Sequence, residues 1–416
     1  MTGVGEEPGF DLRRLLAIAE STAPVDSIDV VAGELRRTIG GRHVSLLITN
    51  FSGTGLARLS HVTAAAELED GRNERVEPVA LPQSIYQTAM FCQSPEVVAV
   101  ADGWIVLAPI TERGDAIGLL EVYLSAEPDA STVDYVATAA HFLAYLLIAS
   151  RRHTDVYEWA QRDVAFSLAA EVQRRLLPSA YTVEGGHFTL AGWLEPAHNV
   201  GGDTFDYALD REYLYASMTD AMGHGEEAAL LATLVVGSLR NTRRNAATPA
   251  EQADAANAAL LKSARADQFV TGQLLRIKLA DGTIDFVNAG HPNPYILRNG
   301  KASEVDMAEP QPPFGITHAE YRTQTAQLRA GDRVVLVTDG YLERNAVRLD
   351  LSGLLNTSID QHPREVVREL AGKVLAATEG NLLDDATILC IDWHGPPEAR
   401  HAAHGANTDR ATPAEA

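Results

Sequence analysis

Four acidic sequence contexts share one feature, because each lies beside an expected strand end or turn. Hard divalent cations such as Mg²⁺ and Mn²⁺ prefer oxygen ligands from carboxylates, carbonyls and water. A strand end holds such a ligand rigidly, and a neighbouring glycine lets the backbone approach an ion or its substrate. The pattern predicts a divalent-cation site, although any one of these carboxylates taken singly is also typical of a turn or helix cap. The residues are Asp203 and Asp206 in "GGDTFD", Asp220 in "TDAMGHG", Asp339 and Glu343 in "TDGYLE", and Asp384 and Asp385 in "LDDATI".

The number of ions follows from what accompanies these carboxylates. The sequence offers no Cys/His ligand set and no Ser-His-Asp arrangement beside them, which favours a dinuclear oxygen site. Two ions roughly 3.5–4 Å apart would activate a water and hold the oxygens of an in-line displacement at phosphorus. Asp220 is expected to end a strand, and the turn Gly223-His224-Gly225 to start the next helix. His224 has two interpretations, as a donor to a phosphate or metal-bound water, or as a turn-stabilising residue.

The elements that must position these carboxylates lie between residues 178 and 394. Asp281-Gly282 and Asn299-Gly300 predict two hairpins, since Asp-Gly and Asn-Gly are strong hairpin signals. The continuous apolar character of "DRVVLVTD" and "DATILCIDW" indicates buried strands. Helices are expected over residues 226–244, 249–262 and 363–377. Strands grouped around helical pairs favour a layered α+β fold over a parallel βαβ fold.

The first 130 residues have the pattern of a separate α/β domain. Two helices, "FDLRRLLAIAE" and "DSIDVVAGELRRTI", precede the strands "HVSLLIT", "WIVLAPI" and "IGLLEVYL", and "ERGDA" forms the turn between the last two. Two cysteines, Cys92 and Cys390, lie far apart in the sequence and form no metal-ligand pair, which indicates a reducing compartment.

Residues 131–177 form a long helical pattern without a strong breaker. A near-heptad apolar stripe occupies Val136, Ala140, Leu143 and Leu147, and a second stripe occupies Val156, Ala160, Val164 and Leu168. The preferred interpretation is a helical linker that dimerises and transmits a signalling state, and the alternative is an intradomain helix followed by a linker. Residues 395–416 are rich in Ala, Pro and charge without periodicity, so we expect a disordered tail.

Bulk composition excludes some classes of function. The chain has 416 residues and a formal net charge of −22, which argues against binding nucleic acid or anionic lipid through general electrostatics. The first ten residues lack the apolar core of a signal peptide. The longest apolar run, "FLAYLLIA" at 142–149, is too short to span a bilayer. We therefore expect a cytoplasmic protein without a membrane span.

Six motifs, taken in order, resemble the signatures of a SpoIIE-type domain, the bacterial branch of the metal-dependent serine/threonine protein phosphatases of the PPM superfamily. They are "EVQRRLLP", "NVGGDTFDY", "TDAMGHGEEAAL", "DFVNAGHPNPYIL", "RAGDRVVLVTDGYLE" and "NLLDDATILCI", between residues 171 and 391. The resemblance implies an α-β-β-α sandwich, in which two antiparallel sheets pack face to face between layers of helices. It assigns residues 178–394 to the phosphatase domain.

The resemblance also implies roles for individual residues in a centre of two Mn²⁺ or Mg²⁺ ions. Asp220 resembles the ligand that bridges the ions, and the carbonyl of Ala221 a further ligand. Asp203 resembles a ligand of the second ion, and Asp339 and Asp384 resemble ligands of the first. Asp220 and Asp339 are the residues expected to act in catalysis.

Asp206, Glu343 and Asp385 remain open between supporting or alternative ligands and solvated or capping carboxylates. Asn288 and His291 are expected to shape a loop near the site. The reaction implied is hydrolysis of phosphoserine or phosphothreonine in a protein, without a covalent enzyme intermediate.

Residues 1–130 resemble a GAF-type sensor, and the helix containing "AAEVQRRLLP" resembles one that acts as a switch for the metal site in similar proteins. The expected substrate is a phosphorylated STAS-type anti-sigma factor antagonist, and the expected assembly is a homodimer through the sensor and the linker helices.

Two other classes of function compete with this interpretation. One is a degenerate phosphatase domain that binds a phosphorylated partner as a scaffold, against which the complete set Asp203, Asp220, Asp339 and Asp384 argues. The other is a nucleotide cyclase or kinase, for which the sequence has neither a P-loop nor a kinase catalytic loop.

Overall fold

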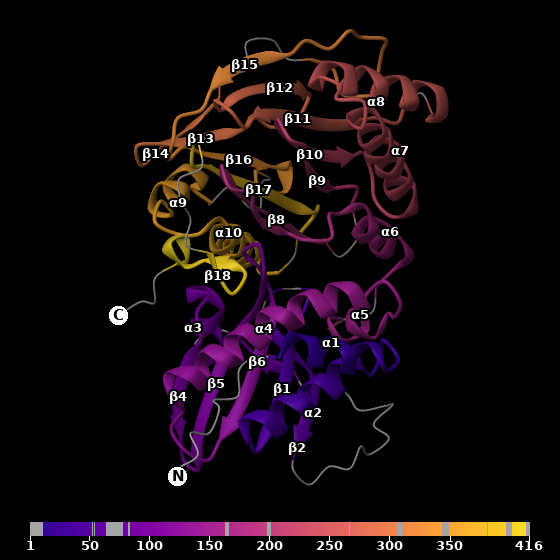
Figure 1. The fold of residues 1–416 in the computed structure, drawn as a ribbon. Coiled ribbons are helices and arrows are strands. Elements are labelled where there is room, and N and C mark those ends of the chain that lie inside the picture. The colour runs from indigo at the N-terminus through magenta and orange to yellow at the C-terminus, as the bar shows by residue number, and fades with distance from the viewer. Residues whose placement is uncertain are drawn as a thin grey trace, which may run out of the picture. The chain divides into compact units, whose positions relative to one another are not determined.

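The chain divides into two compact units, Met1–Ala165 with Arg400–Ala416, and Phe166–Ala399 (Figure 1). A computed structural model describes residues 11–51, 53, 55–63, 78–81, 84–162, 166–197, 201–265, 267–305, 311–342, 349–380, 382–396 and 402–412. The first unit therefore contains both the N-terminal and the C-terminal segments of the chain, and the second unit is inserted between them.

A six-stranded antiparallel sheet forms the centre of the first unit, in the order β3-β2-β1-β6-β5-β4. Its strands are β1 (His43–Thr49), β2 (Gly55–Thr63), β3 (Pro78–Ala80), β4 (Glu96–Val100), β5 (Gly103–Glu112) and β6 (Asp115–Leu124). The turn between β5 and β6 has positive φ at Arg113 and Gly114, as the sequence "ERGDA" predicts. The helices of this unit are α1 (Leu12–Glu20), α2 (Ser27–Ile39), α3 (Ile85–Cys92), α4 (Ala130–Ser150) and α5 (Val156–Ala160).

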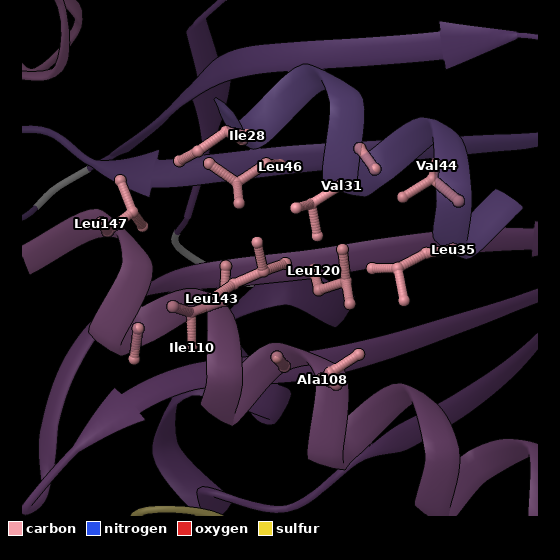
Figure 2. Close-up of a cluster of buried hydrophobic side chains, with 14 of the residues drawn as sticks. Ile28, Val31, Leu35, Val44, Leu46, Ala108, Ile110, Leu120, Leu143 and Leu147 are labelled. Carbon is pink, nitrogen blue, oxygen red and sulfur yellow. The ribbon is translucent and has the colours of Figure 1, made fainter. Parts of the chain in front are cut away.

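The main core of the first unit lies between the sheet and helices α2 and α4. Figure 2 shows Val31 of α2, Leu46 of β1 and Leu143 of α4 converging in this core. Side chains at alternate positions of β1, β5 and β6 point toward these helices, as the two-residue period of a strand requires. A second, smaller cluster includes Leu47 and Leu119 from the sheet and Met90 of α3.

Helix α4 corrects the preferred interpretation of residues 131–177. The near-heptad stripe Val136, Ala140, Leu143 and Leu147 is buried in the core of the first unit, so α4 is an intradomain helix and not part of a separate rod. The helical pattern is also interrupted after Ser150, before the short helix α5. Among the described residues, α4 is the one helix long and apolar enough to cross a membrane, and its buried stripe has the character of a core helix.

The C-terminal segment also differs from the expected disordered tail. Residues 402–410 form the strands β18 (Ala402–Ala403) and β19 (Ala406–Asn407) and the short helix η2 (Thr408–Arg410). Ala406 and Asn407 are buried, and the amide of Gly114 donates to the carbonyl oxygen of Gly405 at 2.9 Å. Tertiary packing in the first unit orders a segment that has no periodicity of its own.

Two antiparallel sheets form the second unit, in the orders β15-β12-β11-β10-β9 and β14-β13-β16-β17-β8-β7. The first sheet consists of β9 (Thr204–Leu209), β10 (Tyr213–Ala221), β11 (Val270–Lys278), β12 (Thr283–Ala289) and β15 (Gln324–Gln327). The second consists of β7 (Thr182–Glu184), β8 (Phe188–Glu195), β13 (Tyr295–Arg298), β14 (Lys301–Glu304), β16 (Arg333–Val337) and β17 (Ala386–Trp393). The helical elements are α6 (Leu168–Leu176), α7 (Glu226–Arg243), α8 (Pro249–Ser263), η1 (Asp339–Tyr341), α9 (Leu351–Thr357) and α10 (Pro363–Ala377).

The sheets pack face to face, and helices cover their outer faces. Phe205 and Met218 of one sheet share a core with Leu336 and Leu389 of the other. The alternate side chain Cys390 faces α9 and α10 in a second core. Helices α7 and α8 cover the first sheet in a third core. The α+β sandwich of antiparallel sheets expected from the sequence is confirmed.

Both predicted hairpins are present. Asp281-Gly282 lies between β11 and β12, and Asn299-Gly300 lies between β13 and β14. Asn299 and Gly300 both have positive φ, the backbone conformation of the two-residue hairpin turn that Asn-Gly favours.

Candidate metal centre

Strand pairing brings the predicted aspartates together at one edge of the sandwich. Asp203 directly precedes β9 and Asp220 lies at the end of β10, and the pairing of Thr204 with Thr219 places the two aspartates side by side. In the other sheet, Asp339 follows β16 and Asp384 precedes β17, its antiparallel neighbour. Each sheet therefore contributes carboxylates from two neighbouring strands.

Asp203 links the two sheets. Its side chain is 1% exposed, and its Oδ2 accepts hydrogen bonds of 2.7 Å from the hydroxyls of both Thr338 and Thr387. The Thr338 hydroxyl in turn accepts from the amide of Thr387 at 2.9 Å. These bonds fix the orientation of the Asp203 carboxylate at the base of the centre.

The carboxylates lie close enough to perturb one another. Burial, followed by the negative charges of Asp339, Asp384 and Asp385, raises the pKa of Asp220 to about 7. Burial and the charges of Asp220 and Asp385 raise the pKa of Asp203. Such mutual repulsion is what a cation between the carboxylates would relieve.

Burial also raises the pKa of Asp384, and the charge of Asp339 acts in the same direction. His224 has the opposite effect on this carboxyl, which places its imidazole within electrostatic reach of Asp384. Asp339 itself is exposed at the start of η1.

Asp385 holds the loop that precedes β9. It is 1% exposed, and its carboxylate accepts from the amides of Ala197 at 2.8 Å and Gly201 at 3.1 Å. Its Oδ2 also accepts from the side-chain amide of Gln173, a buried residue of α6. The same amide donates to the carbonyl oxygen of Asp203 at 2.9 Å. Asp385 and Gln173 therefore tie α6 to the carboxylate cluster.

Asp206 has a different set of partners. Arg240 donates to both of its carboxylate oxygens at 3.0 Å, and Arg243 donates to Oδ2 at 2.9 Å. Arg240 also donates to the carbonyl oxygen of Leu176, so this cluster joins the end of α6 to α7. Asp206 thus stabilises the packing of α6 and α7 around the centre. Glu343 lies outside the described residues.

Two glycines allow the backbone to approach closely at the centre. A Cβ added to Gly202 would lie 2.5 Å from both the Cβ and the carbonyl oxygen of Ala221. A Cβ added to Gly201 would lie 2.6 Å from an oxygen of Asp384. The sequence "GGD" is therefore required by space, because any larger residue would push the Ala221 carbonyl or Asp384 out of place.

The loop after β12 is shaped as the sequence suggests. Asn288 accepts from the amide of His291 at 2.8 Å and donates to its carbonyl oxygen at 2.9 Å, which closes the turn. The His291 Nδ1 lies 2.8 Å from the hydroxyl of Thr271, the residue paired with Asp220 across β10 and β11. Burial lowers the pKa of His291 to about 3 and keeps the ring neutral.

The donor set fits hard divalent cations. All the charged side chains that raise the pKa of Asp220 are carboxylates, and the neighbouring carbonyl of Ala221 adds a further oxygen. In the described parts of the chain, no three His, Cys, Asp or Glu side chains already converge tightly enough to enclose an ion.

Three large apolar side chains are exposed within three residues of these aspartates. Met222 is 40% exposed, Leu342 is 44% exposed and Leu383 is 71% exposed. We name these three residues the apolar rim.

Sequence reasoning did not single out Gln173, Thr338 or Thr387. Gln173 lies inside the quoted motif "EVQRRLLP", and Thr338 directly precedes Asp339 in "TDGYLE". Their roles depend on partners more than a hundred positions away. The sequence signal for Gln173 was its helical spacing from the apolar residues Ala169 and Leu176, which places a polar side chain on the apolar face of the helix.

Comparisons with known proteins found one matching family and several relatives. Residues 210–394 match the family described as Stage II sporulation protein E (SpoIIE), a range that includes Asp220, Asp339 and Asp384 but begins after Asp203. Two curated relatives come from Bacillus subtilis. The phosphoserine phosphatase RsbU is 22% identical over 230 residues, which are 54% of this chain and 68% of RsbU. The phosphoserine phosphatase RsbP is 22% identical over 236 residues, 54% of this chain and 57% of RsbP.

Among solved structures, the RsbU and RsbW domains of a Mycobacterium tuberculosis protein are 23% identical, with a TM-score of 0.47, over 56% of this chain and 65% of that one. The SpoIIE match contains helices α7, α8, α9 and α10 and three of the four aspartates. Strands β7, β8 and β9 precede the match, and the other strands of both sheets lie within it. Residues 210–394 thus match the SpoIIE family, and two curated phosphoserine phosphatases are similar to this chain over 54% of its length.

Proposed function

We propose that the whole chain dephosphorylates a phosphoserine or phosphothreonine of a STAS-type anti-sigma factor antagonist in a partner-switching pathway of stress or development. The observation that carries this proposal is the convergence of Asp203, Asp220, Asp339 and Asp384 from two neighbouring strands of each sheet. The similarity of the second unit to the phosphoserine phosphatases RsbU and RsbP supports the substrate class.

Asp203, Asp220, Asp339, Asp384 and the carbonyl oxygen of Ala221 would hold two Mn²⁺ or Mg²⁺ ions. When bound, such ions activate a water and neutralise the phosphate dianion. The chain's own residues provide the geometry, because Thr338 and Thr387 orient Asp203 by hydrogen bonds. His224, which acts electrostatically on Asp384, would donate a hydrogen bond to an incoming phosphate.

Regulation by the first unit completes the proposal. Residues 1–130 would act as a GAF-type sensor, and α6 would carry its state to the centre through Gln173. The ion pairs of Arg240 and Arg243 with Asp206 would hold the opposite end of α6 in place during this change. A cytoplasmic homodimer is the assembly that we propose for this signalling.

A degenerate scaffold that binds a phosphorylated partner is the second candidate. The open spacing of the carboxylates among the described residues is the observation that favours it. A scaffold would bind the phosphoprotein without releasing phosphate, so the two functions differ in a single measurement.

The test is release of inorganic phosphate from a phosphoserine STAS-domain protein by the full chain, with Mn²⁺, with Mg²⁺ and with chelator. Asp220→Asn removes a carboxylate that is expected to hold the ions. Asp281→Asn is the matched control, because it makes the same chemical change in an exposed hairpin turn where Asn-Gly is equally favourable. Metal-dependent turnover that survives in the control and disappears in Asp220→Asn supports the phosphatase. Binding of the phosphoprotein without turnover under all conditions supports the scaffold.

A further inference from the structure

The loop between β12 and β13 carries the chain from one sheet of the sandwich to the other. Before the loop, β12 is paired with β11, which in turn pairs with the strand that ends at Asp220 and Ala221. After the loop, β13 is paired with β16, which leads to Asp339. The loop therefore connects the parts of the two sheets that supply the carboxylates.

His291 is buried in this loop, and it contacts the first sheet through Thr271. The Nδ1 atom of the ring and the Thr271 hydroxyl lie 2.8 Å apart, within hydrogen-bond distance. Thr271 is the residue opposite Asp220 in the pairing of β10 with β11. One nitrogen of the imidazole therefore holds the strand segment beside Asp220.

The same ring lies close to the second sheet. Tyr295 pairs with Val335, so the chain just before β13 runs beside the end of β16. The backbone of Val337 opposes the effect of burial on the pKa of His291, which places this backbone within hydrogen-bonding reach of the ring. Val337 lies two residues before Asp339. His291 thus reaches both sheets of the centre.

The loop holds this histidine in place from both sides. The Asn288 side chain bonds both the amide and the carbonyl oxygen of His291. The side-chain amide of Gln273, on β11, donates to the carbonyl oxygen of Pro292. Gly290 has a φ of 69°, and an added Cβ there would lie 2.6 Å from the side chain of Pro313. The loop therefore presents the ring in a fixed position.

The ring makes one well-formed hydrogen bond among the described residues, the one with Thr271. Its Nε2 is buried without such a partner, so the contact with Val337 is a looser one. Removal of the Thr271 hydroxyl therefore isolates what the imidazole contributes to the centre.

We infer that His291 is a positioning residue of the metal centre, which ties the strand segment beside Asp220 to the strand that leads to Asp339. It thereby sets the spacing between the carboxylates of the two sheets. The imidazole acts through Thr271 and the strands, without a hydrogen bond to any aspartate among the described residues. The inference rests on the proposed function for its link to catalysis, while affinity for the ions can be measured without a substrate.

The test measures the affinity of the full chain for Mn²⁺ by calorimetry. Thr271→Val keeps the shape of the side chain and removes the hydroxyl that contacts His291. Thr189→Val is the matched control, because the Thr189 hydroxyl also lies 2.8 Å from a histidine nitrogen, that of His394. Thr189 pairs with Asp392, near the end of β17 that lies away from the metal centre.

We expect Thr271→Val to lower the Mn²⁺ affinity about tenfold, the lower range for loss of a partner that orients metal ligands. Thr189→Val should leave that affinity unchanged, and both variants should lower the midpoint of denaturant unfolding in chelator to a similar extent. Thr271→Ser restores a hydroxyl and should recover the wild-type affinity. Equal Mn²⁺ affinities in Thr271→Val and Thr189→Val would overturn the inference.

His291→Phe tests whether the two residues act through one contact, since it keeps a buried ring and removes both nitrogens. The double variant with Thr271→Val should bind Mn²⁺ as His291→Phe alone does, because residues that share one contact are not additive. Losses of affinity that multiply would show two separate effects and would also overturn the inference.

The proposed function can fail separately. A chain that binds Mn²⁺, loses affinity in Thr271→Val and hydrolyses no phosphoprotein leaves the positioning role standing and refutes the phosphatase. A chain that hydrolyses phosphoprotein, with equal Mn²⁺ affinity in the two threonine-to-valine variants, refutes the positioning role alone.

Discussion

The side-chain amide of Gln173 donates a hydrogen bond to the carboxylate of Asp385, which joins helix α6 to the acidic centre across more than two hundred positions of sequence. The second hydrogen of that amide goes to the Asp203 carbonyl oxygen. One side chain therefore positions parts of both sheets, and its removal has a testable effect.

Gln173→Leu keeps a similar volume but removes both donated hydrogen bonds. We expect a roughly 10–100-fold loss of Mn²⁺ affinity, the usual effect of losing a partner that orients metal ligands. Mn²⁺ titrations of phosphatase activity and of calorimetric heat check this value. Arg175→Gln on the exposed face of α6 is the control, since it breaks a surface ion pair with Glu171. Equal Mn²⁺ affinities in the two variants would contradict the positioning role.

Asp220→Asn should have opposite effects on metal-free stability and on activity. The substitution removes one negative charge from a cluster of mutually repelling carboxylates, so the metal-free chain should unfold at a higher temperature. Activity should fall by more than about 100-fold, beyond the loss expected for a merely supporting partner. Thermal unfolding with chelator and with Mn²⁺ measures the first part, and release of phosphate from the phosphoprotein measures the second. A variant that keeps the stabilisation by Mn²⁺ would show that Asp220 is not a ligand.

Gly202→Ala tests the close packing against Ala221. Its Cβ would lie 2.5 Å from the Ala221 carbonyl oxygen, so we expect both lower stability and loss of metal-dependent activity. Gly372→Ala in α10 is the matched control, because it is in a helix interior with nothing within 4 Å of the new Cβ. The control should be stabilised by about 0.5–1 kcal/mol. Denaturant unfolding with an activity assay distinguishes the two outcomes.

Acid should weaken the first unit through Glu121. Burial alone would raise the pKa of this carboxyl, but hydrogen bonds and the charge from Arg58, with the Tyr86 hydroxyl, outweigh it and lower the pKa below its ordinary 4.5. Arg58 donates at 2.7 Å and Tyr86 at 2.8 Å. Because the folded pKa is depressed, this contribution is complete above pH 4.5 and is lost as the pH falls through the folded value.

Glu121→Gln should therefore cost about 1–3 kcal/mol at neutral pH, where buried donors lose a charged acceptor. Below pH 4.5 the difference from wild type should shrink. Unfolding temperatures measured across the acid range check this sign, with Glu96→Gln on β4 as a control for the change in net charge. A difference that grows toward low pH would contradict it.

The apolar rim should affect protein substrates selectively. Met222→Ser combined with Leu383→Ser removes exposed apolar surface beside the aspartates without changing a carboxylate. We expect KM for the phosphoprotein to rise about tenfold, the effect of losing roughly one buried methylene or two from an interface. Hydrolysis of p-nitrophenyl phosphate should be unaffected. Equal losses of activity with both substrates would show that these residues support the structure of the metal centre and do not bind the protein substrate.

Strands, hairpins and the strand-end aspartates of the second unit could be predicted because their signals are local. Asp281-Gly282 and Asn299-Gly300 determine turn geometry within two residues. The resemblance of ordered motifs then supplied the pairing of sheets, which no single motif contains. Asp385 stayed ambiguous because its amide partners, Ala197 and Gly201, come from a distant loop.

The predictions for residues 131–177 and for the C-terminal segment were wrong because the same sequence pattern is compatible with two different structures. The stripe of Val136 and Leu143 suits a coiled-coil seam, but it also suits a helix buried against a sheet, and the sheet was the partner. Local composition likewise gave no sign that residues 402–410 are ordered. Their order depends on Gly405, which fits a surface formed by Thr111 and His141 nearly three hundred positions away.

The tight contacts of Gly201 and Gly202 have a consequence for comparing related chains. A single methyl group at either position would displace an oxygen expected to bind metal, even in a chain that kept every aspartate. Counting acidic residues alone would then mistake an inactive homologue for an enzyme. The glycine pair is therefore a stricter marker of catalytic competence than the aspartates alone, because both glycines are needed to leave the expected metal-binding oxygens in place.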